Sequence, residues 1–193
     1  PVTVTNPEEI SALKGVTYIR GDLVVSSEDL EDLSALQCLE RVKGNMSIEY
    51  CSKLKNVDHL ERLTSVFGEL AIVGNPSLEN IDGLHFLESA NGVKISNCES
   101  LESIEPLATA FVADSLRDVK ILRLRHLENI DVLSGVTTAR YMTIGACENL
   151  QNIDGLKSLR VVSSLSIFGN PLLTNLNSIN GLKSIYDLNI IEN

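Results

Sequence analysis

Hydrophobic residues recur along this chain in a fixed order of slots that are separated by polar positions. Residues 70–87 (LAIVGNPSLENIDGLHFL) show the order as L-x-I-x-x-N-x-x-L-x-x-I-x-x-L-x-x-L. The same slots return at intervals of 23 to 26 residues. The units start at Leu23, Met46, Leu70, Val93, Val119, Met142, Leu165 and Leu188. A period of this length predicts a solenoid, in which each unit packs against the next.

Each unit opens with an apolar–polar–apolar triplet, which predicts a short strand with one buried face. The first and third residues then point into the core, and the middle one points to solvent. The later slots, I-x-x-L-x-x-L, predict the other buried corners of the unit. The fold class is therefore expected to be mainly β, with the main strands forming an extended flat sheet.

Two columns of small polar residues accompany the apolar slots. The sixth slot holds Asn or Cys in most units, at the ladder position of leucine-rich repeats, where a small side chain can satisfy backbone groups of the turn from inside. This column is Cys51, Asn75, Cys98, Leu124, Cys147 and Asn170. The second column is expected to hydrogen-bond its own turns and to bridge neighbouring units. It is Asn56, Asn80, Ser103, Asn129, Asn152 and Asn175.

A short helix is predicted before the repeats. Asn6 is a suitable N-cap, Pro7 fits the first helical position, and Glu9 is placed to complete a capping box. Gly15 is expected to end this helix. We interpret it as a cap on the first unit.

The period is longest between Val93 and Val119, where residues 107–118 depart from the consensus. An insertion of this kind is expected to form a surface loop. The main basic cluster of the chain lies around the end of this insertion. The cluster is Arg117, Lys120, Arg123, Arg125 and His126. It is either a site for an acidic partner or an anionic glycan, or a solvated patch that balances nearby acidic residues.

Composition narrows the class of protein further. The chain has 193 residues, of which 44% are hydrophobic and 4% aromatic, which suits one continuous repeat core. We expect a single domain over 1–193, with a cap at 1–15 and repeats at 16–190. The net charge of −10 argues against a nucleic-acid or anionic-membrane partner. No apolar run approaches about 18 residues, so no membrane insertion of this segment is expected. Because Pro1 is not a natural start, we expect the segment to belong to a larger chain.

The four cysteines are interpreted as buried free thiols. Cys51, Cys98 and Cys147 occupy one slot in alternate units, so they would lie roughly 9–10 Å apart, too far for a disulfide. A bridge between Cys38 and Cys51 is the alternative. No metal site is expected, because the chain lacks a C-x-x-C motif or a Cys/His cluster.

No sequence motif indicates catalysis. Nucleophile-elbow, phosphate-loop, dinucleotide and zinc-protease motifs are all missing, so we expect no catalytic residue and no cofactor. A β-helix polysaccharide lyase or hydrolase would need several Asp, with Arg or Lys, stacked on one face. The acidic residues are instead spread along the chain.

The slots that face away from the core suggest a binding surface, because aromatic and Arg anchors on a flat sheet are typical of protein interfaces. Scattered surface hydrophobes are also normal, which is the alternative interpretation. The candidate ligand-binding residues are Tyr50, Val73, Leu122, Arg123, Arg125, Tyr141 and Phe168.

The chain resembles the receptor L-domain family in three stretches, 21–25 (GDLVV), 68–78 (GELAIVGNPSL) and 80–84 (NIDGL). This family supplies the ligand-binding lobes of the insulin and epidermal growth factor receptors, and related domains occur in fungal and bacterial surface proteins. The resemblance implies a right-handed parallel β-helix of about seven to eight coils that binds partners outside the cell without catalysis. The animal receptors carry disulfides at both domain ends. This chain lacks those cysteines, so a microbial or fungal surface protein fits better.

The expected function is therefore non-catalytic recognition of a protein or glycan ligand by a cell-surface or secreted module. A cytosolic leucine-rich-repeat scaffold is one alternative, which the free cysteines favour. A structural protein of the cell wall is another. The expected localisation is extracellular or at the cell surface, with the cytoplasm as the alternative.

Overall fold

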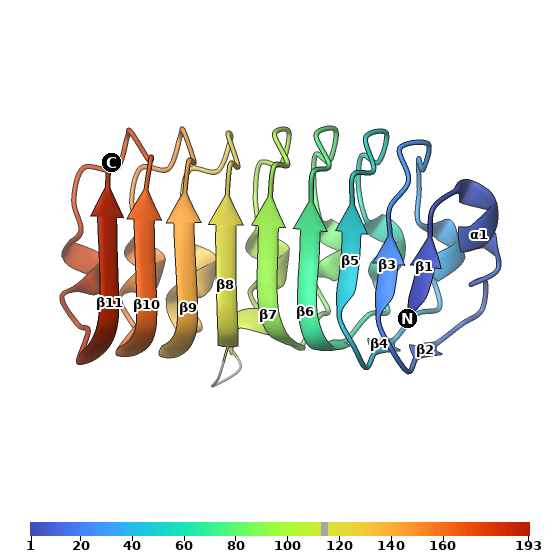
Figure 1. Ribbon diagram of the computed structural model, residues 1–193, viewed down its shortest axis with the longest axis horizontal. Helices are drawn as coiled ribbons and strands as arrows, with labels where there is room; N and C mark the ends of the chain where they lie inside the picture. The colour runs from blue at the N-terminus through green and yellow to red at the C-terminus, as the bar shows by residue number, and fades with distance from the viewer. Residues whose placement is uncertain (113–115) are drawn as a thin grey trace.

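The computed structural model describes residues 1–112 and 116–193, and its main feature is one parallel sheet of eleven strands (Figure 1). The strands are β1 (Val2–Val4), β2 (Tyr18–Ile19), β3 (Leu23–Val25), β4 (Arg41–Val42), β5 (Met46–Glu49), β6 (Ser65–Val73), β7 (Ser89–Ser96), β8 (Leu116–Leu122), β9 (Thr138–Gly145), β10 (Val161–Phe168) and β11 (Ser184–Ile191). The long path runs β1-β3-β5-β6-β7-β8-β9-β10-β11, and β2 and β4 pair beside it. The mainly β class is thus confirmed, and the single parallel sheet is compatible with the expected solenoid.

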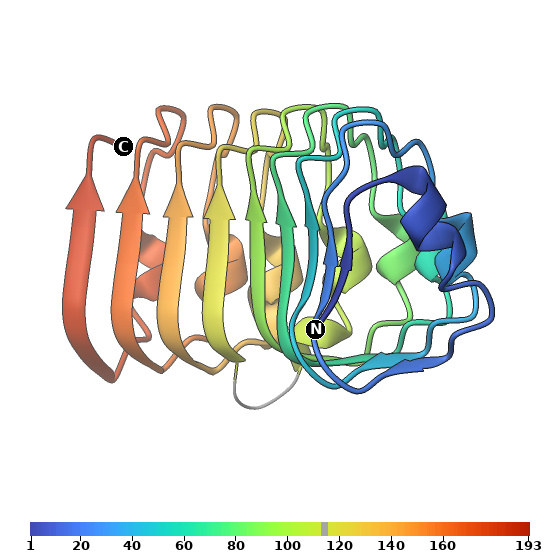
Figure 2. The same ribbon diagram turned by 45° about the vertical axis from the view of Figure 1, so that its right-hand side comes forward.

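Helices are few and short. The α-helix is α1 (Pro7–Ser11), and the other helical segments are 3-10 turns on the side away from the main strands (Figure 2). They are η1 (Ser34–Leu36), η2 (Asp58–Leu60), η3 (Asp82–Leu84), η4 (Glu105–Leu107), η5 (Ala110–Val112), η6 (Asp131–Gly135), η7 (Asp154–Leu156) and η8 (Asn177–Ile179).

The sheet register follows the repeat. Each unit start pairs with the next one, as in Met46 with Leu70 and Leu165 with Leu188. The apolar slots of the inner units are fully buried, and the buried residues form one cluster that extends from Val4 to Leu173. The period of the hydrophobic slots therefore predicts both the strands and their register.

The ladder column works as the sequence predicts. The Asn75 side chain accepts from the Cys51 N–H at 2.8 Å and donates to the Ile48 carbonyl at 2.9 Å, both in the preceding unit. Asn170 does the same for Cys147 and Ile144. These buried side chains tie consecutive turns together.

The second polar column closes its own turns. In each of its members the side-chain oxygen accepts a hydrogen bond from the backbone N–H two residues later, as Asn80 does from Asp82 at 3.2 Å. The same bond recurs at Asn56, Ser103, Asn129, Asn152 and Asn175. The local turn role is confirmed. Within the described residues, the side chains of this column make no hydrogen bond to a neighbouring unit.

The N-terminal helix is present but shorter than expected. It ends at Ser11, and Gly15 lies in the turn that follows, with φ +82°. Asn6 caps it by accepting from the Glu9 N–H at 2.9 Å. The Glu9 carboxylate accepts from the Thr5 N–H and hydroxyl, and these bonds lower the pKa of that carboxyl. The capping box thus closes one residue earlier than predicted.

The predicted surface loop at 107–118 is wrong in part. Ala110 and Phe111 are fully buried, and Phe111 is among the largest fully buried side chains of the described chain. The inserted residues fill core volume through η5 before β8 begins at Leu116. Residues 116–118 of the predicted loop belong to β8, and residues 113–115 lie outside the described residues.

The cysteines are free, so the alternative of a Cys38–Cys51 bridge is wrong. Cys51, Cys98 and Cys147 are buried at the ladder position, and burial raises the pKa of each thiol. Cys38 is half-buried, so the prediction of four buried thiols holds for three of them.

Candidate functional site

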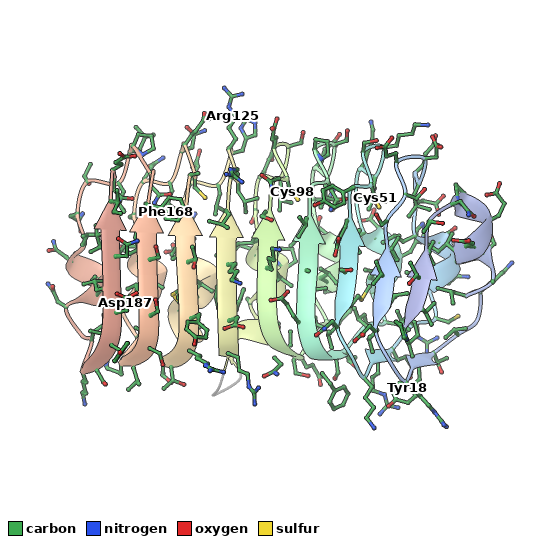
Figure 3. The ribbon with its side chains drawn as sticks, in the orientation of Figure 1. Tyr18, Cys51, Cys98, Arg125, Phe168 and Asp187 are labelled. Carbon is green, nitrogen blue, oxygen red and sulfur yellow. The ribbon has the colours of Figure 1, made fainter. Side chains whose placement is uncertain are left out.

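The candidate surface is the solvent side of the main strands, which we call the outer face. Along each strand, the residue between the two core slots points to this face, and so does the third residue after the unit start. Neighbouring strands lie about 4.8 Å apart, so residues of one slot form a row across the sheet. Figure 3 shows this face, with Phe168 on β10 and Asp187 on β11.

Two of the predicted residues share an apolar strip near the carboxyl ends of the strands. Leu122, Gly145, Phe168 and Ile191 are register partners across β8 to β11. A Cβ added at Gly145 would lie 2.6–2.8 Å from ring carbons of Phe168, so the ring lies over that glycine. We call Leu122, Phe168 and Ile191 the apolar strip. Leu122 and Phe168 are half-buried, and Ile191 is 48% exposed.

Tyr50 lies at the end of β5, three strands away from β8, and is 59% exposed. Its φ of +54° belongs to a column of left-handed residues that follow the main strands. Gly74 is its counterpart in the next unit, and a Cβ added there would lie 2.7 Å from the Tyr50 ring. Tyr50 therefore covers the neighbouring turn and stands apart from the apolar strip.

Val73 is not an exposed anchor, contrary to the sequence-based expectation. Its slot faces outward, between Glu49 and Ser96 in the register, yet it is only 7% exposed. A ligand on the outer face would touch little of this side chain. The strand pattern predicts the direction in which a side chain points. It does not predict whether neighbouring side chains cover it.

Tyr141 lies on β9 beside Asp118 of β8, near the amino ends of the strands. It is 42% exposed, and the guanidinium of Arg140 lies 5.0 Å from its ring centroid. The Oδ1 atom of Asp118 is buried and has no hydrogen-bond partner among the described residues. Tyr141 is thus a second exposed feature of the outer face, at the opposite end of the strands from Phe168.

Arg123 and Arg125 follow β8 in the loop at its carboxyl end, where Figure 3 shows Arg125 projecting from the sheet edge. Arg125 pairs with Glu148 at 3.2 Å, and Arg123 donates to the Asn97 side chain at 3.4 Å. Both line a cavity of about 300 Å³ together with Glu99, Ala146 and Glu148. Arg125 therefore has an acidic partner, whereas Arg123 bonds to a neutral amide.

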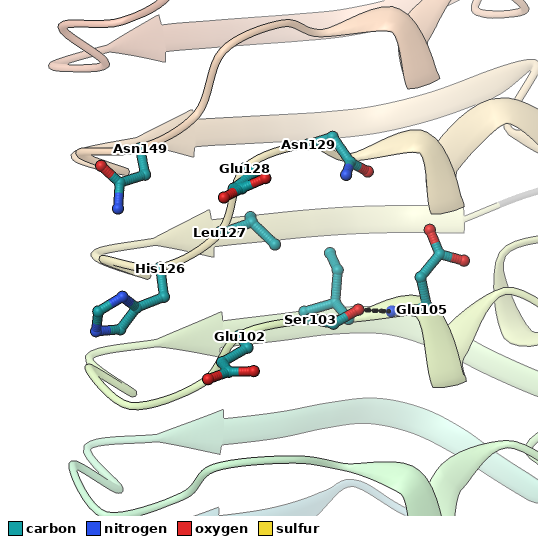
Figure 4. Close-up of a pocket in the computed structure, with 9 residues that line it drawn as sticks. Glu102, Ser103, Glu105, His126, Leu127, Glu128, Asn129 and Asn149 are labelled. Carbon is teal, nitrogen blue, oxygen red and sulfur yellow. Dashed lines mark hydrogen bonds between the residues drawn. The ribbon is translucent and has the colours of Figure 1, made fainter.

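His126 lies in a larger cavity of about 480 Å³ between consecutive units (Figure 4). Glu102, Glu105 and Glu128 line the same cavity, and the Glu105 N–H donates to the Ser103 hydroxyl. This lining would repel an anion. Among the described residues, no group of His, Cys, Asp and Glu could hold a metal ion.

The sequence reasoning missed one feature of the outer face. Lys94 and Lys120 are register partners on β7 and β8, and both are half-buried. We call them the lysine pair. Both occupy the outward slot between the two core residues, so aligning that slot across the units would have found them.

No protein-family model matches this chain, and no curated protein matches it either. Within residues 1–112 and 116–193, no helix has both the length and the apolar character needed to span a bilayer.

Proposed function

We propose that this chain is a non-catalytic recognition module that binds a protein or glycan ligand on its outer face. The observation that carries the proposal is the apolar strip, which extends over four adjacent strands on a surface that no described element covers. Exposed contiguous apolar area on a folded protein is typical of an interaction site.

The handedness of the fold and the number of its coils are part of the same proposal. We take the stack to be a right-handed β-helix of about seven to eight coils, as the resemblance to the receptor L-domain family implies. A cell-surface or secreted location follows from that resemblance. The buried hydrogen bonds of Asn75 and Asn170 tie consecutive turns together. A fixed surface loses little conformational entropy when it binds a partner.

A cytosolic interaction scaffold is the second candidate, and the free thiols are the observation that favours it. Three of these thiols are fully buried, and burial keeps them protonated and shielded from oxidants. Free cysteines of this kind are therefore compatible with either compartment.

The test is a binding screen of the purified chain against an array of secreted proteins and glycans. A variant with Arg123, Tyr141 and Phe168 changed to Ala should lose the partner while remaining folded. Ala146 has the same left-handed backbone as Arg123, so alanine is compatible with that position.

The matched control changes the same three residue types elsewhere, in a Tyr18→Ala, Arg62→Ala, Phe86→Ala variant. All three side chains are exposed and lie off the long strand path. This control should bind as the unmodified chain does. A screen in which no partner is found, or in which both variants lose it equally, would contradict the proposal and favour a structural role.

A further inference from the structure

We infer that the lysine pair forms the polar half of the binding site, and that the partner is a protein segment in which a carboxylate lies next to an apolar side chain. This inference rests on the proposed function and adds the chemistry of the ligand.

The lysine pair destabilises the sheet as long as it has no partner. Lys94 and Lys120 face the same side from directly opposite positions on neighbouring strands. Like charges in that arrangement destabilise a sheet. Neither ammonium takes part in any ion pair among the described residues. Arg125 and Lys53, in contrast, each have an acidic partner.

The neighbours of the lysine pair in the same row are uncharged. The row that contains the lysine pair continues through Ala71 on one side and Thr143 on the other, so no carboxylate stands beside either lysine in register. Asp118 is two residues before Lys120 on the same face, and its Oδ1 is buried. The pair therefore presents two cationic groups in a chain whose net charge is −10.

The apolar strip begins next to the lysine pair. Leu122 follows Lys120 by two residues on the same strand and the same face, so the two side chains are roughly 7 Å apart. From Leu122 the strip continues over Phe168 to Ile191. A ligand that reaches from the lysine pair to the strip needs a carboxylate and an apolar group at about that separation, as in Glu-x-Leu of an extended peptide.

The same geometry disfavours an acidic glycan. Sugars are commonly bound by stacking on exposed aromatic faces. The exposed ring of this part of the outer face is Tyr141, the register partner of Asp118 two residues before Lys120. The guanidinium of Arg140 already lies over that ring at 5.0 Å. The apolar strip consists of two aliphatic side chains and a ring that covers Gly145, which suits apolar side chains better.

The experiment measures binding of three probes to the immobilised chain. The first is a synthetic extended peptide with repeated Glu-x-Leu, the second is the same peptide with Gln for every Glu, and the third is heparin. We expect the Glu peptide to bind and the Gln peptide to bind at least about tenfold more weakly, because a hydrogen bond to a charged group changes the dissociation constant by roughly that factor. Raising the salt concentration from about 0.1 M to 1 M should weaken binding of the Glu peptide, since the screening length falls from about 10 Å to 3 Å.

The variants are Lys94→Gln/Lys120→Gln and a control, Lys14→Gln/Lys183→Gln. Both remove two positive charges, and the control lysines are exposed at sites away from the outer face. The first variant should lose about tenfold or more in affinity for the Glu peptide, and the control should not change. Asp118→Asn should tighten binding, because it removes the negative charge nearest the pair.

Equal affinity of the two double variants would overturn the inference, as would a chain that fails to bind the Glu peptide. Binding of heparin alone would assign the face to a glycan and also overturn it. A partner from the array that needs Tyr141 and Phe168 but tolerates Lys94→Gln/Lys120→Gln would keep the proposed function and remove only this inference.

Discussion

The same Leu-x-Ile triplet has opposite environments in the last two strands. In β10, Leu165 and Ile167 are fully buried. In β11, their register partners Leu188 and Ile190 are 47% and 38% exposed. The local sequence is nearly identical, and the difference is that β10 has a strand on both sides. Burial of this triplet in β10 therefore depends on the neighbouring strands on both of its sides.

The largest expected effect comes from truncating one leucine of each strand. Leu165→Ala should lower the free energy of unfolding by about 2–5 kcal/mol, because it removes buried methyl groups and leaves a cavity. Leu188→Ala should lower it by about 1 kcal/mol or less, because that side chain is half in solvent already. The measurement is urea unfolding followed by circular dichroism. Equal losses in the two variants would refute the comparison.

The next largest loss of stability is expected from substitution of the ladder asparagines. Asn75→Ala should lower the free energy of unfolding by about 2–4 kcal/mol, because it leaves the buried Cys51 N–H and Ile48 carbonyl without partners. Asn193 makes the same kind of bonds to Asn170 and Ile167 at the exposed end, where water can replace them. Asn193→Ala should cost no more than about 1 kcal/mol. If Asn193→Ala lowered the free energy of unfolding as much as Asn75→Ala does, water would not replace the lost bonds at the last turn.

A smaller effect is expected at the opposite end, where β1 pairs with β3 and α1 lies beside it. Asn6→Ala should lower stability by about 1 kcal/mol through loss of the N-cap bond to the Glu9 N–H. Asn6→Asp, which keeps a capping oxygen, should restore most of it. If both variants unfold at the same urea concentration, the cap does not act through that bond.

The smallest effect is a pH dependence that distinguishes Cys from Asn at the ladder position. The pKa of the Cys98 thiol is raised above its ordinary value of 9.0 by burial. The unfolded thiol ionises first, so stability is constant below about pH 9 and falls as the pH rises through the folded pKa. Urea midpoints measured between about pH 8 and 10.5 should show this fall.

The control for that measurement is Cys98→Asn. An amide there can make the bonds that Asn75 and Asn170 make, so the variant should remain folded and its alkaline loss should be smaller. An identical loss in both proteins would mean that other groups, such as lysines and tyrosines, cause all of it.

The sequence by itself determined the repeat, the main strands, their register and the two polar columns. Each of these depends on residues within one unit or on the same slot one period later, so the pattern of slots contains them. The lysine pair belongs to this group as well, since Lys94 and Lys120 share a slot in consecutive units.

Tertiary structure decided which side chains are buried and which of them meet, because the repeat period does not contain that information. Phe111 is buried because the inserted residues fold back into the core, and Val73 is covered although its slot faces outward. Phe168 joins Leu122 in one strip because Gly145, between them, leaves room for the ring. Leu188 is exposed although its slot is a core slot. In every case the burial of a side chain depends on the side chains of other units that pack around it. A repeat pattern determines the direction of a side chain but does not determine those neighbours.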